Sequence, residues 1–217
     1  MANEEAVQAG NFLRDVLERY REWLKREAPN TARGLNKGLG ASEIQRVVAG
    51  WDVPLPEDLF ALFEIFNGQR GEKLALLPCP IAHTPGLRLA RLEDMEAWNN
   101  AFGGEIYLFK NLGWYKSYQA SPQIRSEFWL DGWLPFADVR MEREGLYLTL
   151  FIDLQPAPEG KVGQVVLNMR RVEDGRMHLE RRVLAASLAE YFTDVIALMA
   201  SGSVAIDSKY GIAWPAR

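Results

Sequence analysis

The chain has 217 residues, of which 48% are apolar and 25% charged, and its formal net charge is −4 at pH 7. This composition is typical of a globular protein with one sizeable core. The slight acidic excess excludes an overall basic footprint, so we predict that the chain does not bind nucleic acid. Its apolar runs stay short of the roughly 18 residues that a membrane helix needs, so we predict no membrane segment.

The N-terminal residues and the cysteine count indicate the compartment. The first residues, MANEEAVQAGNF, lack a basic region followed by an apolar core, so no secretory signal peptide is expected. A single cysteine, Cys79, excludes an internal disulfide bond and fits a reducing environment. These features predict a cytoplasmic protein.

A wide apolar stripe over residues 11–28 predicts the first helix. Pro29 ends this helix, and residues 30–41 form a glycine-rich polar connector. Residues 1–39 are therefore predicted to be an N-terminal helix and connector. The stripe would serve equally to pack on the chain's own domain or on another subunit. It comprises Phe12, Leu13, Val16, Leu17, Tyr20, Trp23 and Leu24.

Two short helices are predicted next. Residues 42–45 (SEIQ) have the spacing of a capping box and predict a helix that ends near Gly50. Pro56 suits the first turn of the following helix, and Asn67 with Gly68 forms a good left-handed terminator for it.

The pattern then changes to that of strands. LALLP (74–78) and EIYLF (105–109) are predicted to be strands, with a short helix at about 93–100 between them. Stronger strand patterns occupy residues 146–153 and 162–170.

A hairpin and a helix follow. The second strong strand runs through Asp174 and Gly175, a type I′ turn signal, into residues 177–184. Residues 187–202 then predict an amphipathic helix, and residues 203–217 a C-terminal extension. Helices, then strands, then a helix indicate the α+β class. We predict a single mostly antiparallel (mixed) sheet backed by helices, with an added N-terminal helix.

Metal-ligand spacing is absent from the sequence. The two histidines, His83 and His178, lie far apart, and neither has a partner at ligand spacing. We therefore predict no metal and no cofactor. Cys79 and His83 form a conceivable nucleophile pair. The favoured interpretation of Cys79 is a small, half-buried hydrophobic residue in a loop.

Four arginines fall on the two arms of the predicted hairpin and would form a local basic patch. Acidic neighbours would partly neutralise it, which favours exposed strand arginines over a nucleic-acid contact. His178 lies on the same hairpin, where alternation predicts a solvated position beside Glu180 and Arg182. The four arginines are Arg170, Arg171, Arg181 and Arg182.

Asp153 closes a predicted strand ahead of a corner rich in proline and glycine. Its carboxylate either works as a catalytic acid or base, or accepts backbone N–H bonds from the turn. Catalysis would need a second ionisable group that converges on it, and Asp138 is the candidate. The turn role is favoured, so we predict no catalytic residue and no enzyme activity.

Aromatic residues are the strongest sign of a binding surface. The chain has seven tryptophans, and three of them lie in segments that mix aromatic, polar and turn residues, as loops over a sheet would. Tryptophan and tyrosine in such places are typical of binding surfaces. The candidate partner-binding residues are Trp114, Tyr115, Trp129, Trp133, Asp138 and Asp153.

Four segments, in this order and at suitable spacing, resemble the SUKH superfamily, the Smi/Knr type of cell-wall-assembly regulator domain. They are LPEDLFALFEIFNGQ (55–69), WLPFAD (133–138), FIDLQPAPEGKVGQVV (151–166) and SLAEYFTDVIALMASG (187–202). The resemblance covers residues 40–202 and implies an α+β domain that binds proteins. The matching positions, many of which would maintain the fold, are Asn67, Gly68, Trp133, Pro135, Asp138, Asp153, Pro156, Gly163 and Gln164.

The resemblance also implies a class of function. Bacterial members are often immunity proteins, made in the cytoplasm to neutralise a cognate secreted toxin by direct contact. Fungal relatives are regulatory scaffolds in cell-wall signalling. We therefore expect a protein partner, with a cognate toxin as the first candidate and a regulatory scaffold as the alternative. A small-molecule binder is the third hypothesis. The sequence carries no signal for the oligomeric state.

Overall fold

The computed structural model describes residues 2–51, 53–71, 75–81, 84–141, 144–207 and 211–213. The chain divides into two compact units. The helical unit comprises Met1–Leu92 with Leu188–Arg217, and the sheet unit comprises Glu93–Ser187. The boundaries predicted after residues 39 and 202 stay predictions.

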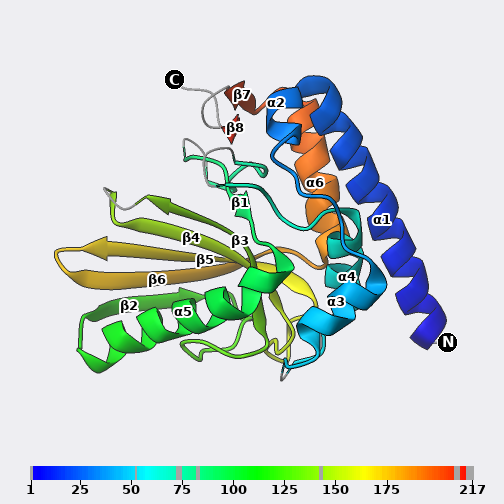
Figure 1. The fold of residues 1–217 in the computed structure, drawn as a ribbon. Coiled ribbons are helices and arrows are strands. Elements are labelled where there is room, and N and C mark those ends of the chain that lie inside the picture. The colour runs from blue at the N-terminus through cyan, green and yellow to red at the C-terminus, as the bar shows by residue number, and fades with distance from the viewer. Residues whose placement is uncertain are drawn as a thin grey trace. The chain divides into compact units, whose positions relative to one another are not determined.

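The helical unit contains most of the helices (Figure 1). Its short strands include an antiparallel pair, β7 with β8. Its elements are α1 (Ala2–Glu27), α2 (Pro29–Ala32), α3 (Ala41–Val48), α4 (Glu57–Ile65), β1 (Arg88–Leu89), α6 (Leu188–Ala200), β7 (Ala205–Asp207) and β8 (Gly211–Ala213).

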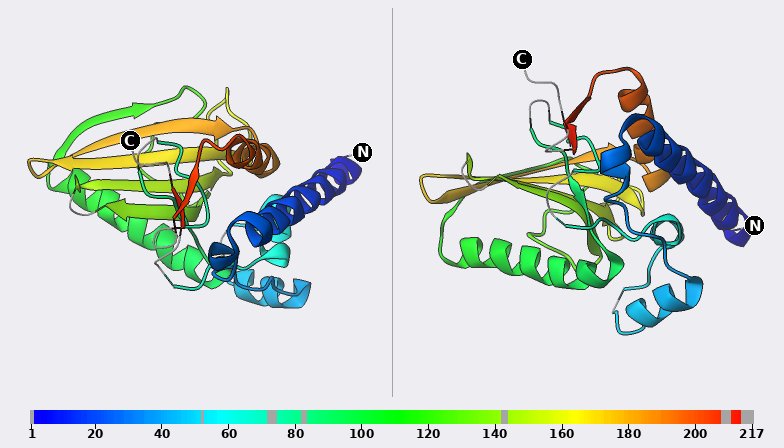
Figure 2. Two further views of the ribbon diagram at one scale, coloured as in Figure 1. Left: turned by 90° about the horizontal axis from the view of Figure 1, so that it is seen from above. Right: turned by 45° about the horizontal axis from the view of Figure 1, so that its top comes forward.

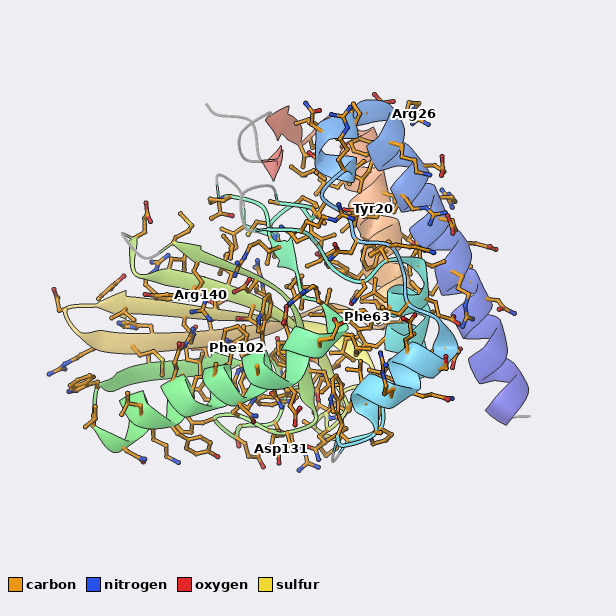
Figure 3. All side chains as sticks on the ribbon, in the orientation of Figure 1. Tyr20, Arg26, Phe63, Phe102, Asp131 and Arg140 are labelled. Atoms are coloured by element: carbon orange, nitrogen blue, oxygen red, sulfur yellow. The ribbon has the colours of Figure 1, made fainter. Side chains whose placement is uncertain are left out.

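Helix α1 packs on its own unit, against α4 and α6. Tyr20 is fully buried and meets the ring of Phe192 edge-on at 5.4 Å (Figure 3 labels Tyr20). Arg14 adds ion pairs with Glu57 at 3.1 Å and Glu64 at 2.6 Å. The predicted stripe is confirmed except for Phe12, which is 55% exposed, and Trp23, which is half-buried.

The caps of α3 and α6 follow from local chemistry. Helix α3 begins one residue before the predicted capping box, because the N–H of Gly40 donates to the Glu43 carboxylate at 2.8 Å. The predicted cap at residues 42–45 was therefore misplaced. At α6 the N–H of Leu188 donates to the Asp58 carboxylate. Burial raises the pKa of Asp58, and the hydrogen bond from Leu188 only partly opposes that rise.

The sheet unit contains a mixed, mainly antiparallel sheet with α5 along one face (right view of Figure 2). Its strands lie in the order β3-β4-β5-β6-β2, and only β2 runs parallel to its neighbour, β6. The predicted α+β class is confirmed. The elements are α5 (Leu92–Asn111), β2 (Tyr115–Ala120), β3 (Trp133–Met141), β4 (Leu146–Asp153), β5 (Gln164–Glu173) and β6 (Arg176–Ala185).

The hairpin between β5 and β6 forms as predicted. Asp174 has φ of 51° and Gly175 φ of 70°, the left-handed values that a type I′ turn requires. The strong pattern at residues 146–153 is strand β4, and the pattern predicted at 162–170 is strand β5, which begins two residues later, at Gln164, and continues to Glu173.

The predicted strand at 105–109 was wrong, because these residues belong to the 20-residue helix α5. Two adjacent glycines interrupt the helical signal, and the aromatic residues after them resemble a strand. Packing decides the outcome: Phe102 and Ile106, four residues apart, bury one helix face against the sheet. A Cβ on Gly103 would lie 3.0 Å from the Trp129 ring, so glycine lets α5 approach this side chain.

The described part of the other weak strand, residues 75–78, forms two isolated bridges instead. Ala75 pairs with Gly211, and Leu77 pairs with Leu87. Residue 74 lies outside the described residues.

The core of the sheet unit lies between α5 and the sheet and is rich in aromatic side chains. Among the described residues, no helix combines the length and apolar character that crossing a bilayer requires. The core residues are Phe102, Ile106, Ile124, Trp129, Trp133, Phe151, Val166 and Met177.

Candidate functional site

Asp153 is the centre of a hydrogen-bonded corner at the end of β4. It is fully buried, and its neighbours in the sheet are Trp133 on β3 and Gln164 on β5. Trp133 Nε1, Gln164 Nε2 and the backbone N–H of Gln155 each donate to its carboxylate at 2.9 Å. Three donors on one carboxylate hold three segments of chain together.

The residues after Asp153 complete the corner. Gly163, at φ of 88°, donates its N–H to the Asp153 carbonyl at 2.8 Å. Gln164 Oε1 accepts the N–H of Lys161 at 3.1 Å. Pro156 accepts a hydrogen bond from Arg125 Nε at 3.3 Å through its carbonyl. These contacts stabilise the turn and match the structural interpretation of the motif.

Asp138 and Asp153 do not converge. Asp138 pairs with Thr149, four residues before Asp153 on β4, which places the two acids roughly 13 Å apart along the sheet. Asp138 is buried and lies 3.4 Å from Arg140 Nε. Burial raises the pKa of Asp153, and the bonds from Gln164, Gln155 and Trp133 oppose that rise. The arrangement therefore fits a structural acid and not an acid/base pair.

Asn67, Gly68 and Gln69 hold the segment that leads into α5. Asn67 Oδ1 accepts the N–H of Leu92 at 2.8 Å, and Gln69 Oε1 accepts the N–H of Leu89 at 3.0 Å. Gly68 has φ of 61°, and a Cβ on it would lie 2.3 Å from the Ala90 oxygen. These residues therefore set where α5 begins.

Trp129 and Trp133 are core residues. Trp133 begins β3 and has no exposed surface, so the loop placement predicted for it was wrong. Trp129 lies in the preceding loop but is also buried, and it donates Nε1 to Asn99 Oδ1 at 2.5 Å. The rings meet edge-on at 5.6 Å. Neither tryptophan presents a surface to a partner. The same applies to the buried Asp138 and Asp153.

Arg181 is buried, which corrects the exposed position predicted for it. Its guanidinium lies 4.4 Å from the centre of the Trp133 ring. Nε donates to Asn168 Oδ1 at 2.8 Å, and the two terminal nitrogens donate to the carbonyls of Glu127 and Phe128. One side chain thus ties β6 to the loop that carries Trp129.

Arg170 is buried as well, on the same sheet face. It pairs with Glu105 of α5 at 2.5 Å and lies 5.1 Å from the centre of the Tyr147 ring. Arg140 adds a guanidinium 5.6 Å from the Phe102 ring, and both of these residues are labelled in Figure 3. Of the four arginines predicted to form a surface patch, Arg170 and Arg181 therefore hold α5 and its loop on the sheet, whereas Arg171 and Arg182 are exposed.

The remaining candidates have different environments. His178 is half-buried, not solvated: its Nδ1 lies 2.8 Å from Ser117 Oγ, a contact that joins β6 to β2. Cys79 is fully buried, not half-buried, and its Sγ accepts the N–H of Ile81 at 3.4 Å. His83, its predicted partner, lies outside the described residues.

Trp114 is the predicted contact residue that is exposed. It lies three residues after the end of α5 and is 48% exposed. Tyr115 begins β2, and its side chain lies outside the described part of the structure. Nothing in the sequence singled out the apolar residues just before Trp114, because residues 105–109 resembled a buried strand. The exposed group, which we name the α5-tip patch, comprises Tyr107 (47%), Leu108 (54%), Leu112 (48%) and Trp114 (48%).

Tyr107 and Leu108 lie in the last turns of α5, and Leu112 and Trp114 follow its end at Asn111. At 100° per residue, Leu108 points about 140° away from the middle of the face that Phe102 and Ile106 bury. Gly104 lies on the same outer face, where a Cβ would meet nothing within 4 Å. Helix α5 is therefore apolar on both sides near its C-terminus.

No group of three histidine, cysteine, aspartate or glutamate side chains within the described ranges is placed to hold a metal ion.

Residues 38–194 match the SMI1 / KNR4 family (SUKH-1). The match spans more than half of the chain, so the chain belongs to this family, and the predicted resemblance is confirmed. A comparison with curated proteins gave no match.

Proposed function

We propose that this family member is a non-catalytic, cytoplasmic protein-binding domain that neutralises a cognate toxin by direct contact, as immunity proteins do. Membership of the SMI1 / KNR4 family supports the non-catalytic part of this proposal. The observation that carries the proposal is the α5-tip patch, four large apolar side chains that are each about half exposed. Large apolar side chains that are exposed close together along the chain are candidates for an interaction site.

The patch has the composition of an interface centre. Trp114 and Tyr107 offer aromatic area, which dominates binding energies, and Leu108 and Leu112 add exposed aliphatic area. Lys110 lies 4.6 Å from the centre of the Phe128 ring, so its stem also covers apolar surface.

Charge supports the choice of partner. The net charge of −4 favours association with a basic surface, such as the active-site cleft of a toxin that acts on nucleic acid. Inhibition would then be steric and electrostatic: the domain covers the cleft and contributes no chemistry. A nanomolar complex corresponds to about −12 kcal/mol, which a few well-buried anchors supply.

Affinity capture of the tagged full chain from its native cytoplasm tests this function. We expect one stoichiometric partner that resembles a secreted effector. Expression of that partner alone should arrest growth, and co-expression of the chain should restore it. A partner that is harmless when expressed alone would contradict the immunity role.

Several substoichiometric cellular partners would instead favour a regulatory scaffold of the Smi/Knr type. No captured partner would favour a small-molecule ligand. The three outcomes separate the hypotheses before any interface is mapped.

A further inference from the structure

Strand β2 is the outermost strand of the sheet beside β6 (left view of Figure 2). Among the described residues, no strand pairs with its other side. An edge strand presents a row of backbone N–H and C=O groups to any extended chain that approaches it. The direction of each group follows from the ladder with β6.

The ladder shows which groups face outward. The N–H of Ser121 donates to the Arg181 carbonyl at 3.0 Å, so Ser121 faces β6. In a parallel ladder every second residue bonds the neighbouring strand through both its N–H and its C=O. Gln119, in register with Glu180, therefore also faces β6. The backbone groups of Tyr118 and Ala120 point toward the free edge.

The free edge continues directly into the α5-tip patch. Trp114 precedes β2, and its carbonyl accepts the N–H of Met177 at 2.7 Å, which fixes it at the start of the β2–β6 ladder. An extended chain that paired with β2 and ran past its first residue would therefore reach the exposed Trp114 side chain. Backbone pairing would supply affinity, and the aromatic surface would supply a preference for apolar residues.

A second copy of the chain fits this edge poorly. Two β2 strands paired about a two-fold axis at Tyr118 would place each Trp114 roughly 13 Å from the axis, at opposite ends. The two patches would then lie roughly 26 Å apart and would not bury each other. A foreign strand longer than β2 covers the edge and the patch together.

We propose that the partner contributes an extended segment, which adds to the sheet as a further strand beside β2 and buries an apolar side chain against Trp114. This inference rests on the proposed protein-binding function and adds the conformation of the bound partner.

The matched variants Ala120→Pro and Ala120→Ser test the inference. Proline removes the outward N–H of Ala120 and leaves the ladder with β6 intact, because proline is tolerated on edge strands. Serine keeps the N–H. The probe is a library of random 12-residue peptides displayed on phage and selected on the immobilised full chain. We expect the selected peptides to bind wild type and Ala120→Ser alike and to bind Ala120→Pro at least tenfold more weakly.

Amide exchange gives a readout that does not depend on a variant's folding. When a selected peptide binds the full chain, exchange at Tyr118 and Ala120 should slow at least tenfold. Exchange at Ser117 and Gln119, which already face β6, should change little. Uniform slowing, or none, would overturn strand addition.

Trp114→Ala separates this inference from the proposed function. Peptides that lose binding with Trp114→Ala but keep it with Ala120→Pro would overturn the strand and leave the patch as a docking site. Peptides that ignore both variants would overturn both proposals. Protection of Tyr118 and Ala120 by self-association, without any peptide, would overturn the choice of a foreign partner.

Discussion

Replacement of Arg181 by alanine should destabilise the sheet unit far more than loss of an exposed arginine. Two loop carbonyls, those of Glu127 and Phe128, would lose their donor, at about 1–3 kcal/mol each if they stay buried. The contact with the Trp133 ring contributes about 2 kcal/mol when desolvated. Alanine also removes the cost of burying a charged guanidinium, which offsets part of this destabilisation. We therefore expect the free energy of unfolding to fall by about 3–5 kcal/mol.

Urea unfolding of the full chain, followed by tryptophan fluorescence, measures the loss. Arg171→Ala is the matched control, because Arg171 lies on the same hairpin, is half exposed and pairs with an equally exposed Glu173. It should change the free energy of unfolding by less than about 0.5 kcal/mol. The loss for Arg181→Lys should fall between these two values, because lysine keeps the charge but lacks the planar guanidinium with its several donors. Equal losses for Arg181→Ala and Arg171→Ala would refute the anchoring role.

Three further predictions concern the corner at Asp153 and the glycines. Burial raises the pKa of Asp153 in the folded chain, so folding favours the protonated acid. As the pH rises above about 4, the wild-type chain should therefore lose stability relative to Asp153→Asn. Urea midpoints of the two chains that stay parallel from pH 3.5 to 7 would contradict this. Gly68→Ala should cost about 2 kcal/mol or more, because its Cβ would meet a carbonyl oxygen at 2.3 Å. Gly71→Ala, with φ of 67° and open space, should cost only about 1 kcal/mol, and equal shifts in urea midpoint would exclude the steric explanation. Gly104→Ala should stabilise the chain by up to about 1 kcal/mol. Gly103→Ala should not, because the new Cβ would lie 3.0 Å from the Trp129 ring. A gain in melting temperature for both variants would contradict this packing.

The strand and turn patterns were sufficient for much of the sheet. Strand β4 occupies the predicted residues, and Asp174 with Gly175 forms the predicted turn, because alternation and turn chemistry act locally. Helix α5 was missed for the opposite reason. Its glycines weaken the local signal, and its helical state depends on burial of Phe102 and Ile106 against side chains far away in sequence.

The site was predictable only in part, because exposure depends on tertiary packing. Trp114, Trp129 and Trp133 lie in similar local sequence, yet only Trp114 is exposed. Arg181 resembles a surface residue, but the loop carbonyls and rings that surround it come from other segments. Asp153 was interpreted correctly as a turn acid, since the residues that follow it already indicated a corner.

The central claim is that a protein partner docks on the α5-tip patch, and capture with matched variants tests it most directly. Leu108→Glu places a charge within the patch, on the outer face of α5. Val162→Glu places the same charge on an exposed apolar residue in the turn before β5, which begins at Gln164. Both variants should have the melting temperature of the wild-type chain. We predict that wild type and Val162→Glu retain the stoichiometric partner and that Leu108→Glu loses it. Equal capture by all three chains would contradict the account.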